Sequence, residues 1–242
     1  MHYVLGDIHN EINKLRNILK QIHLESGDEL ILLGDVFDRG TDSADPVGIY
    51  FELCKIQGKC TWVCGNHDRW LSQYIKEYYG QSERKQKKIP PYRYNSFELM
   101  KARLTPVDML DIAEIVSKLP LQLEREICGK KFFFSHAMAF NPNAPAEEMD
   151  YLIGNENFED FLLNGVDGFI SICGHTPTGN LQMFKGQYLD ANSKSIWCNE
   201  KKNVIMLDCG CGHGSGTLAA MCLETGERYY SMMTREMYDG SI

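Results

Sequence analysis

Short polar clusters follow apolar, strand-like runs at nearly regular intervals, and this pattern constrains the fold more than any other feature of the chain. The first three runs cover residues 3–5, 30–33 and 61–64, so successive runs are separated by about 30 residues, the length of one strand–helix–strand unit. In a sheet built from such units, the carboxyl ends of the strands share one edge, where side chains distant in sequence meet. We therefore expect an α/β fold with a site at that edge.

The segments between these runs have helical patterning. Apolar residues of segment 12–22 recur at helical spacing, and Pro46 and Gly58 mark the start and the end of a second helix. Further helices are expected over 69–79, 97–104 and 106–119, with short helical pieces near 147–163. Strands are expected at 121–127, 131–135 and 169–173, followed by successive strands over 181–233.

The segment from Gly80 to Ser96 differs from its surroundings because it is polar and basic. It contains the run Arg84–Lys88, followed by two prolines and two tyrosines. Such a composition is typical of an exposed insertion. We expect a single domain over residues 1–242, with a helical and basic insertion at about 80–120.

Composition limits the class of protein. A chain of 242 residues with 43% hydrophobic content can bury one sizeable core. The formal net charge of −8 argues against a general nucleic-acid binder, which is usually basic. Nine cysteines, an odd and scattered set, favour reduced thiols over disulfides, and neither a leader pattern nor a run of 18 apolar residues is present. We expect a soluble, cytoplasmic protein that does not bind membranes.

Four polar clusters carry side chains that bind metal ions. They are Gly6-Asp7-Ile8-His9, Gly34-Asp35-Val36-Phe37-Asp38-Arg39-Gly40, Gly65-Asn66-His67-Asp68 and Gly174-His175-Thr176. Asp7 and His9 are two residues apart, so on extended backbone both side chains point to the same side and can hold one ion. One such pair would be a common turn, but three pairs at strand ends favour a site.

The second metal position follows from a carboxylate that needs neutralisation. Asp35 comes directly after a buried run, where an unpaired charge is costly, and a position between two cations would satisfy it. Asn66 adds an amide oxygen, and His136 and His175 add imidazoles at the ends of their own strands. A mixed nitrogen and oxygen set suits Mn, Zn or Fe better than Ca. The sequence therefore predicts a two-metal hydrolase.

In this order the clusters, together with Gly174-His175-Thr176-Pro177, resemble the metallophosphoesterases of the phosphoprotein phosphatase family, particularly small bacterial and phage serine/threonine phosphatases. The similarity extends from Met1 to about Gly226. It implies a calcineurin-like fold with a central mixed β-sandwich flanked by helices, a four-layer αββα arrangement with the dinuclear site at the loop edge.

The resemblance also implies a role for each site residue. The first metal ion would bind Asp7, His9 and Asp35, and the second would bind Asp35, Asn66, His136 and His175. His67 would be the general acid, Asp38 would orient it, and Arg39 and Asn66 would bind the substrate phosphate. The implied cofactor is a pair of divalent ions, with Mn as first choice and Fe, Zn, Ni and Mg as alternatives.

These roles agree with general chemistry. Two cations about 3.5 to 4 Å apart lower the pKa of a bridging water, which gives a hydroxide nucleophile without a covalent phosphoenzyme. The guanidinium of Arg39 matches the geometry of a phosphoryl group, and a carboxylate beside His67 favours its proton-donating form.

Two features depart from the family pattern. Asn10 stands where relatives have glycine after the first histidine. Relatives also carry a second phosphate-binding arginine between the two late histidines, but residues 136–175 contain no arginine. Asn155 or Asn157 occupies the approximate region, and Arg69 is another candidate, although an arginine on a helix surface is the simpler interpretation.

Two other segments admit alternative interpretations. Cys209, Cys211 and His213 offer three ligands without a clear fourth, so a glycine-rich turn near the rim of the site is favoured over a third metal site. The run Arg84–Lys88, with Tyr92 and Tyr94, is favoured as a solvated loop over a contact for an acidic peptide or a nucleotide.

We expect an enzyme that hydrolyses phosphomonoesters, with a phosphoprotein or a phosphorylated small molecule as substrate. Phosphoserine and phosphothreonine in proteins are the first choice. A symmetrical dinucleoside polyphosphate hydrolase is the alternative enzyme, because the late arginine is missing. A metal-binding regulatory module without catalysis is the third possibility, which the intact His67, Asp38 and Arg39 disfavour.

Overall fold

The computed structural model describes residues 1–41, 43–56 and 58–231. Their strands form two mixed sheets. The first sheet contains, in spatial order, β11 (Arg228–Tyr230), β10 (Ala219–Cys222), β1 (His2–Leu5), β2 (Glu29–Leu32) and β3 (Lys59–Trp62). The second contains β4 (Gln122–Ile127), β5 (Lys130–Ser135), β6 (Ile170–Cys173), β9 (Val204–Met206), β8 (Trp197–Asn199) and β7 (Gly186–Tyr188).

Parallel pairing within each sheet places the site. β1, β2 and β3 are parallel neighbours, as are β5, β6 and β9.

The helices are α1 (Ile12–Ile22), α2 (Pro46–Cys54), α3 (Asn66–Tyr79), α4 (Glu83–Gln86), α5 (Ser96–Lys101), α6 (Pro106–Ser117), α7 (Glu148–Ile153) and α8 (Phe158–Asn164), with a 3₁₀ turn at Thr178–Asn180. No helix in the described ranges is long and apolar enough to cross a membrane.

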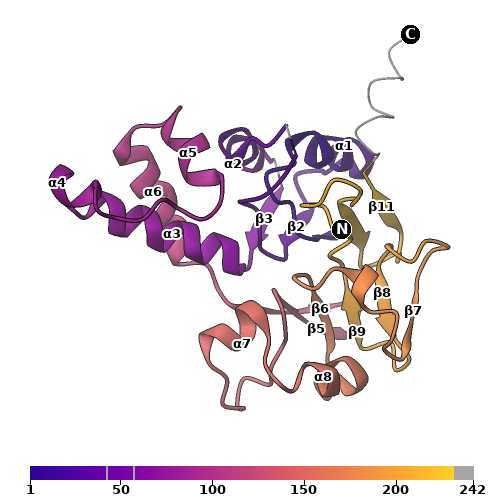
Figure 1. Cartoon of the computed structure of the whole chain (residues 1–242). Coiled ribbons are helices and arrows are strands. Elements are labelled where there is room, and N and C mark those ends of the chain that lie inside the picture. The colour runs from indigo at the N-terminus through magenta and orange to yellow at the C-terminus, as the bar shows by residue number, and fades with distance from the viewer. Residues whose placement is uncertain (42, 57, 232–242) are drawn as a thin grey trace, which may run out of the picture.

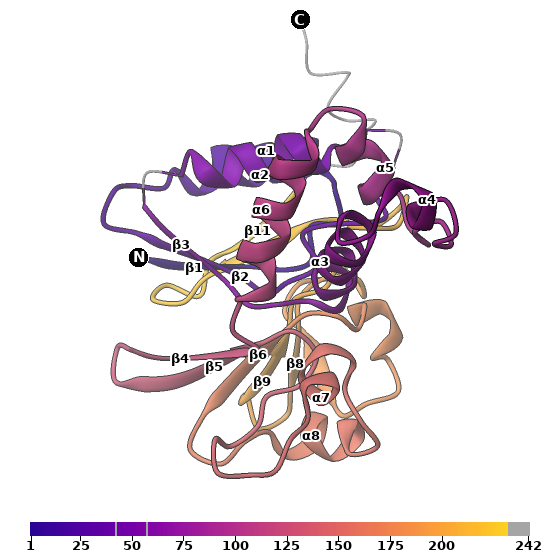
Figure 2. The same cartoon turned by 90° about the vertical axis from the view of Figure 1, so that its left-hand side faces the viewer.

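The two sheets stack face to face between two layers of helices (Figure 2). α1 and α2 lie on the outer face of the first sheet, and α7 and α8 lie beneath the second. Alternation along the strands explains this order: Leu30 and Leu32 face the helices, whereas Ile31 and Leu33 face the other sheet. Phe132 and Phe134 likewise pack between the sheets, while Phe133 packs toward α8. The predicted four-layer arrangement is confirmed.

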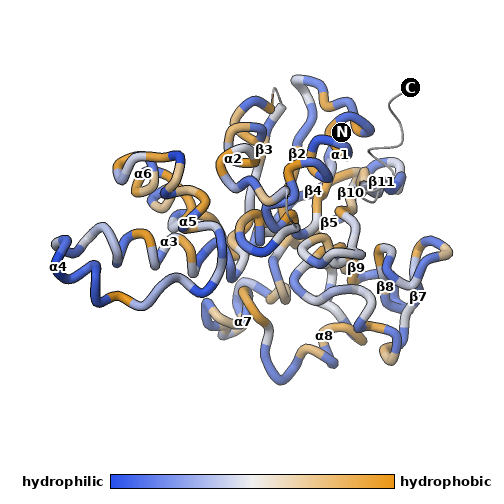
Figure 3. The backbone as a smooth tube through the Cα atoms, turned by 45° about the horizontal axis from the view of Figure 1, so that its top comes forward, coloured by the Kyte–Doolittle hydropathy of each residue, from blue (hydrophilic) through white to orange (hydrophobic). Residues whose placement is uncertain are grey.

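Residues 66–117 form a helical arm that projects beyond the sheets (Figure 1). α6 begins with a capping box, in which Asp108 N donates to the Thr105 hydroxyl and the Asp108 carboxylate accepts from Thr105 N. α4 and its adjoining turns are hydrophilic (Figure 3), and α4 has no buried residue. The basic run Arg84–Lys88 of the expected insertion therefore lies partly in the short helix α4.

Some details differ from the sequence expectations. α3 begins at Asn66 rather than near residue 69, because Asp68 caps its first turn. All nine cysteines are free, as expected; Cys54, Cys60 and Cys128 are exposed and the other six are buried. Residues 232–233, at the end of the predicted series of strands, lie outside the described residues.

Candidate active site

The six predicted metal ligands come from five loops that meet where the two sheets stack. Asp7 and His9 follow β1, Asp35 follows β2, Asn66 begins α3, His136 follows β5 and His175 follows β6. All are buried except His175, which is partly exposed. The first sheet thus supplies four of these side chains and the second sheet supplies two.

One group of donors consists of Asp7, His9 and Asp35, whose ligand atoms all lie within 4.8 Å of one another. His9 Nε2 is 3.9 Å from Asp7 Oδ2 and 3.7 Å from Asp35 Oδ2. Two carboxylates and one imidazole around a common point fit a divalent cation with mixed ligands.

A second group consists of Asp35, His136 and His175. His136 Nε2 is 3.4 Å from Asp35 Oδ2, and Asn66 Oδ1 lies 2.9 Å from His136 Nε2 and 3.0 Å from His175 Nδ1. The two imidazole nitrogens face each other at 3.2 Å. Asp35 Oδ2 therefore lies between an imidazole of each group, which is the geometry of a carboxylate shared by two cations.

Backbone carbonyls orient the imidazoles. His136 Nδ1 is 2.8 Å from Leu33 O, and His9 Nδ1 is 3.2 Å from Phe37 O. A carbonyl only accepts hydrogen bonds, so in each neutral ring Nδ1 carries the hydrogen and Nε2 presents its lone pair to the carboxylates. This is the tautomer that a metal ion needs.

The charges in the site are unbalanced without cations. Burial raises the pKa of Asp7 well above its usual range, and the nearby Asp208 adds to the rise. Burial lowers the pKa of His9 to about 4 and that of His175 to about 3. Burial also opposes charge on His136, but Asp35 and Asp7 raise its pKa to about 10.

A proton on His136 thus balances part of the negative charge of the metal-free site. Asp35 is deprotonated in the same state, because His136 and His9 outweigh its burial and hold its pKa well below the usual range. A divalent cation would take the place of that proton and would satisfy the carboxylates as well. The residues present therefore fit a pair of cations.

Asp208 is an acidic neighbour of this site that the sequence reasoning missed. It follows β9, is buried, and accepts a hydrogen bond from Gly210 N at 2.8 Å. Burial raises its pKa to about 7, and Asp35 acts in the same direction. The sequence does contain a signal for it, because Asp208 follows an apolar run in the same way as Asp7 and Asp35.

His67 and Asp38 form a buried pair beside the metal ligands. His67 Nδ1 is 3.0 Å from Asp38 Oδ2, and His67 N donates to Asp35 Oδ1 at 2.9 Å. His67 Nε2 is buried and has no hydrogen-bond partner among the described residues. A buried polar atom without a partner is costly unless a ligand meets it, so this atom is available to a bound substrate.

Arg39 is half-buried at the edge of the site, with Nη1 3.4 Å from His213 Nε2. Its loop is strained, because Asp35, Asp38 and Arg39 all have left-handed backbone with φ of 47°, 67° and 60°. Strain of this kind persists only where the surroundings enforce it, and it is concentrated at functional sites.

Asn10 and Gly34 allow the loops to approach one another. Asn10 has a φ of 62°, which asparagine tolerates better than most residues, and its Nδ2 donates to Ser96 Oγ at 2.9 Å. This answers the departure noted in the first motif. Gly34 has a φ of 93°, and a side chain there would lie 2.6 Å from Gly65 N, so only glycine lets these two loops meet.

Asp68 is a second residue whose importance the sequence did not reveal. One carboxylate oxygen accepts from Val36 N at 3.0 Å and Phe37 N at 3.3 Å. The other accepts from Gly65 N and Trp62 Nε1, each at 3.1 Å. Asp68 therefore joins the loop after β2 to the loop after β3 and fixes the backbone that carries Asp35 and His67.

Arg69 and Asn155, two candidates for the role of the missing arginine, have hydrogen-bond partners outside the two metal-ligand groups. Arg69 contacts Ser117 O at 2.8 Å and Glu148 at 2.6 Å, which agrees with a structural role. Asn155 Oδ1 accepts from Asn157 N in a local turn. His213, from the glycine-rich loop after β9, is the side chain that reaches Arg39.

The glycine-rich loop lies beside the site. Cys209 and Cys211 are buried, and the candidate metal groups of the described chain include neither of them nor His213. Lys14, also buried, donates from Nζ to Cys211 O at 2.9 Å and to Gly216 O at 3.0 Å. The loop is thus held by a lysine, as a structural turn near the rim.

The model of the calcineurin-like phosphoesterase family matches residues 3–207. This chain therefore belongs to the calcineurin-like phosphoesterase family. An uncharacterized protein of Methanocaldococcus jannaschii is 27% identical over 200 residues, which cover 80% of this chain and 72% of that protein.

Solved structures share the fold at low sequence identity. A putative diadenosine tetraphosphatase has a TM-score of 0.59 at 19% identity, covering 95% of this chain and 91% of its own. A protein serine/threonine phosphatase from Saccharomyces cerevisiae has a TM-score of 0.53 at 15% identity, covering 95% and 79%. A hypothetical protein from Pyrococcus horikoshii has a TM-score of 0.53 at 12% identity, covering 99% and 92%. The predicted calcineurin-like fold is confirmed.

Proposed function

We propose that this phosphoesterase is a dinuclear metal-dependent phosphatase that hydrolyses phosphomonoesters, with phosphoserine and phosphothreonine in proteins as its substrates. We place it near the phosphoprotein phosphatase branch of the family and in the cytoplasm. The observation that carries the proposal is Asp35, whose Oδ2 faces His9 at 3.7 Å and His136 at 3.4 Å and so belongs to both donor groups.

The proposed ligands are Asp7, His9 and Asp35 for one cation, and Asp35, Asn66, His136 and His175 for the other. The mixed donor set favours Mn, with Fe, Zn, Ni and Mg as alternatives. When bound, the two cations supply an activated water and neutralise the charge of the phosphate.

The remaining steps belong to this chain's own side chains. Arg39 and Asn66 bind the oxygens of the substrate phosphate and so fix its orientation. His67 Nε2, which has no other partner in the described chain, donates its proton to the leaving alcohol oxygen. Asp38 holds His67 through Nδ1 and stabilises the proton-bearing ring.

The test uses the full chain with Mn and a phosphoserine peptide, with 4-nitrophenyl phosphate as a second substrate. Phosphate release should stop on addition of EDTA and return when Mn is added in excess. Activity that persists in EDTA would show that the metal ions have no part in the reaction. A chain that binds Mn but hydrolyses neither substrate would favour the regulatory module without catalysis.

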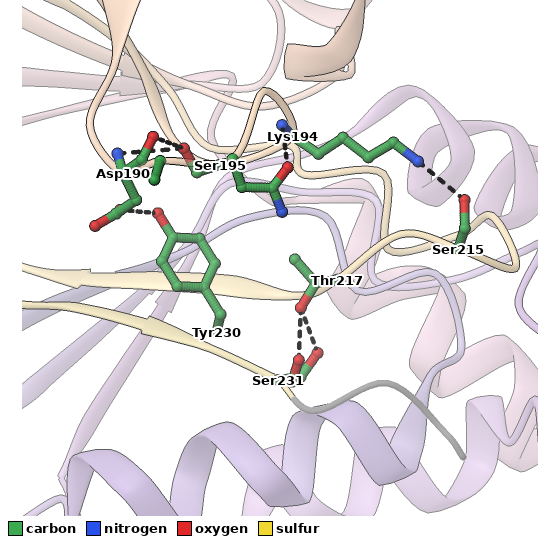
Figure 4. A pocket seen from close by; sticks show the side chains of 9 residues that line it. Asp190, Lys194, Ser195, Ser215, Thr217, Tyr230 and Ser231 are labelled. Atoms are coloured by element: carbon green, nitrogen blue, oxygen red, sulfur yellow. Dashed lines mark hydrogen bonds between the residues drawn. The ribbon is translucent and has the colours of Figure 1, made fainter. Parts of the chain in front are cut away.

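A groove beside the site favours the second candidate, a symmetrical dinucleoside polyphosphate hydrolase. His213, which reaches Arg39, lines a cavity of about 240 Å³, and Lys194 and Ser215 line both this cavity and a neighbouring one of about 450 Å³. Figure 4 shows Lys194 extended toward Ser215, with Tyr230 and Asp190 on the other side of the larger cavity. An extended ligand with several phosphates and a ring would fit this path.

A comparison of turnover decides between the two candidates. Diadenosine tetraphosphate and a phosphoserine peptide are assayed side by side, with the Lys194→Ala variant in parallel. If the second candidate is correct, the tetraphosphate is the better substrate and the variant raises its KM alone. If the first is correct, the peptide is preferred and the variant has little effect.

A further inference from the structure

The segment after the basic run Arg84–Lys88 returns to the proposed general acid. Tyr92 donates a hydrogen bond from its hydroxyl to Asp38 Oδ2 at 2.6 Å, and the same oxygen is 3.0 Å from His67 Nδ1. We propose that Tyr92 is a positioning residue of the catalytic pair: it holds the Asp38 carboxylate in the orientation that directs His67 Nε2 toward the leaving group. This inference rests on the proposed function.

Asp38 has few other contacts that could fix its side chain. It is completely buried, and its second oxygen, Oδ1, has no hydrogen-bond partner in the part of the chain that the structure describes. Its backbone N is paired with Ser96 Oγ at 2.7 Å, which holds the main chain but leaves the carboxylate free to rotate. Tyr92 and His67 are thus the two side chains that define where Oδ2 lies.

The Tyr92 ring is itself held firmly by other aromatic side chains. It packs against Tyr74 with ring centroids 4.9 Å apart and against Tyr94 at 5.8 Å. Tyr94 in turn lies 4.4 Å from the ring of His67, and Tyr74 donates to Pro90 O at 2.9 Å. A rigid ring loses little further entropy when its hydroxyl is aimed at Asp38.

The hydroxyl keeps its proton throughout the working pH range. Burial raises the pKa of Tyr92 above its ordinary value, and the neighbouring Asp38 raises it further. Tyr92 is therefore a donor to Asp38 Oδ2, the same carboxylate oxygen that His67 Nδ1 approaches. Loss of the hydroxyl would leave the Asp38 carboxylate with one hydrogen-bond partner, His67.

The leaving group of the substrate distinguishes a positioning role of Tyr92 from a role in which Tyr92 only anchors its segment to the site. Proton donation by His67 matters when the leaving alcohol is a poor leaving group, as serine is. It matters little for 4-nitrophenol, which leaves as an anion without help. A defect that acts through His67 therefore affects phosphoserine alone, whereas a loosened arm or a distorted metal site affects both substrates.

The experiment compares Tyr92→Phe with Tyr74→Phe in the full chain with Mn. Tyr74→Phe is the matched control, because it removes a hydroxyl from the same aromatic cluster that bonds Pro90 O and not Asp38. We expect Tyr92→Phe to lower kcat on a phosphoserine peptide by about tenfold, the value of one hydrogen bond to a charged group. Its kcat on 4-nitrophenyl phosphate and its KM should be unchanged, and Tyr74→Phe should behave as the parent on both substrates.

A double-mutant cycle gives a second reading. In the Asp38→Asn background, Tyr92→Phe should cause no additional loss, because the two residues act through one contact. Equal losses of Tyr92→Phe on both substrates, no loss on phosphoserine, or additive losses in the cycle would each overturn the inference. Absence of activity in the parent chain would instead refute the proposed function. If the parent is active and His67→Asn slows hydrolysis of the phosphoserine peptide selectively, the proposed role of His67 stands, and the result for Tyr92→Phe tests Tyr92 alone.

Discussion

The two sheets contribute to the site in different ways. The loops of the first sheet carry Asp7, His9 and Asp35, and they also carry the proposed acid His67 with its partner Asp38. The second sheet contributes the imidazoles of His136 and His175 and the buried carboxyl of Asp208. We infer that the first sheet provides both metal binding and proton transfer, whereas the second completes the metal site.

The largest effect is expected from Asp35→Asn, because Asp35 is the residue that both donor groups share. The variant should reduce phosphatase activity to background and should bind fewer than two metal ions per chain, measured by elemental analysis after gel filtration. Asp28→Asn, at a surface contact with the N-terminus, is the control. Full metal content in Asp35→Asn would disprove the shared position.

The next largest effect tests the division between the sheets. His67→Asn should lower kcat on a phosphoserine peptide by about 10² to 10⁴-fold while metal content stays the same, because in the proposed mechanism His67 moves a proton and binds no ion. His23→Asn, an exposed residue at the end of α1, should have parental kinetics. A loss of metal in His67→Asn would assign it to the metal site instead.

Arg39→Ala should have a smaller effect. We expect kcat/KM to fall by about 10- to 100-fold, mainly through KM, because hydrogen bonds to the charged phosphate are lost. Inorganic phosphate should also inhibit the variant less strongly. Arg16→Ala, whose side chain pairs with Glu52 on the surface, should leave both measurements as in the parent. A change in kcat alone would mean that Arg39 acts only in the transition state.

The smallest effect concerns pH and the second sheet. In the metal-free protein the pKa of His136 is raised to about 10, so its bound proton stabilises the fold fully below pH 6.5, and this contribution is lost as the pH rises toward 10. Thermal melting in EDTA should therefore fall by several degrees between pH 7 and pH 9. His136→Asn should show a shallower decline, and an equal slope in both proteins would contradict the assignment.

Much of the first sheet and its ligands could be predicted, because local sequence determines them. Each of β1, β2 and β3 leads into a short apolar stretch, at residues 3–5, 30–33 and 61–64, and its ligand follows within a few residues. The left-handed backbone at Asp35 and Asp38 accompanies glycines at positions 34 and 40 that were part of the motif. These features depend on neighbours in the chain and therefore appear in the sequence.

The residues that were missed depend on contacts between distant segments. Asp208 follows an apolar run, as Asp7 and Asp35 do, but its place in the site depends on the pairing of β9 with β6 across 30 or more residues. Tyr92 reaches Asp38 because its segment folds back onto α3. In the sequence alone, the basic composition of this segment predicts a solvated loop. Asp68 looks like part of a metal motif, yet it bonds backbone N–H groups of two loops.

The shared position of Asp35 has a consequence for how the molecule is assembled in a cell. Cations that bind there link chain segments more than 100 residues apart, from both sheets. The binding free energy of the ions therefore also stabilises the contact between the two sheets. A shortage of metal would then weaken the contact between the two sheets before either sheet unfolds. Amide hydrogen exchange along β2 and β5 would record that loosening directly, independent of any catalytic assay.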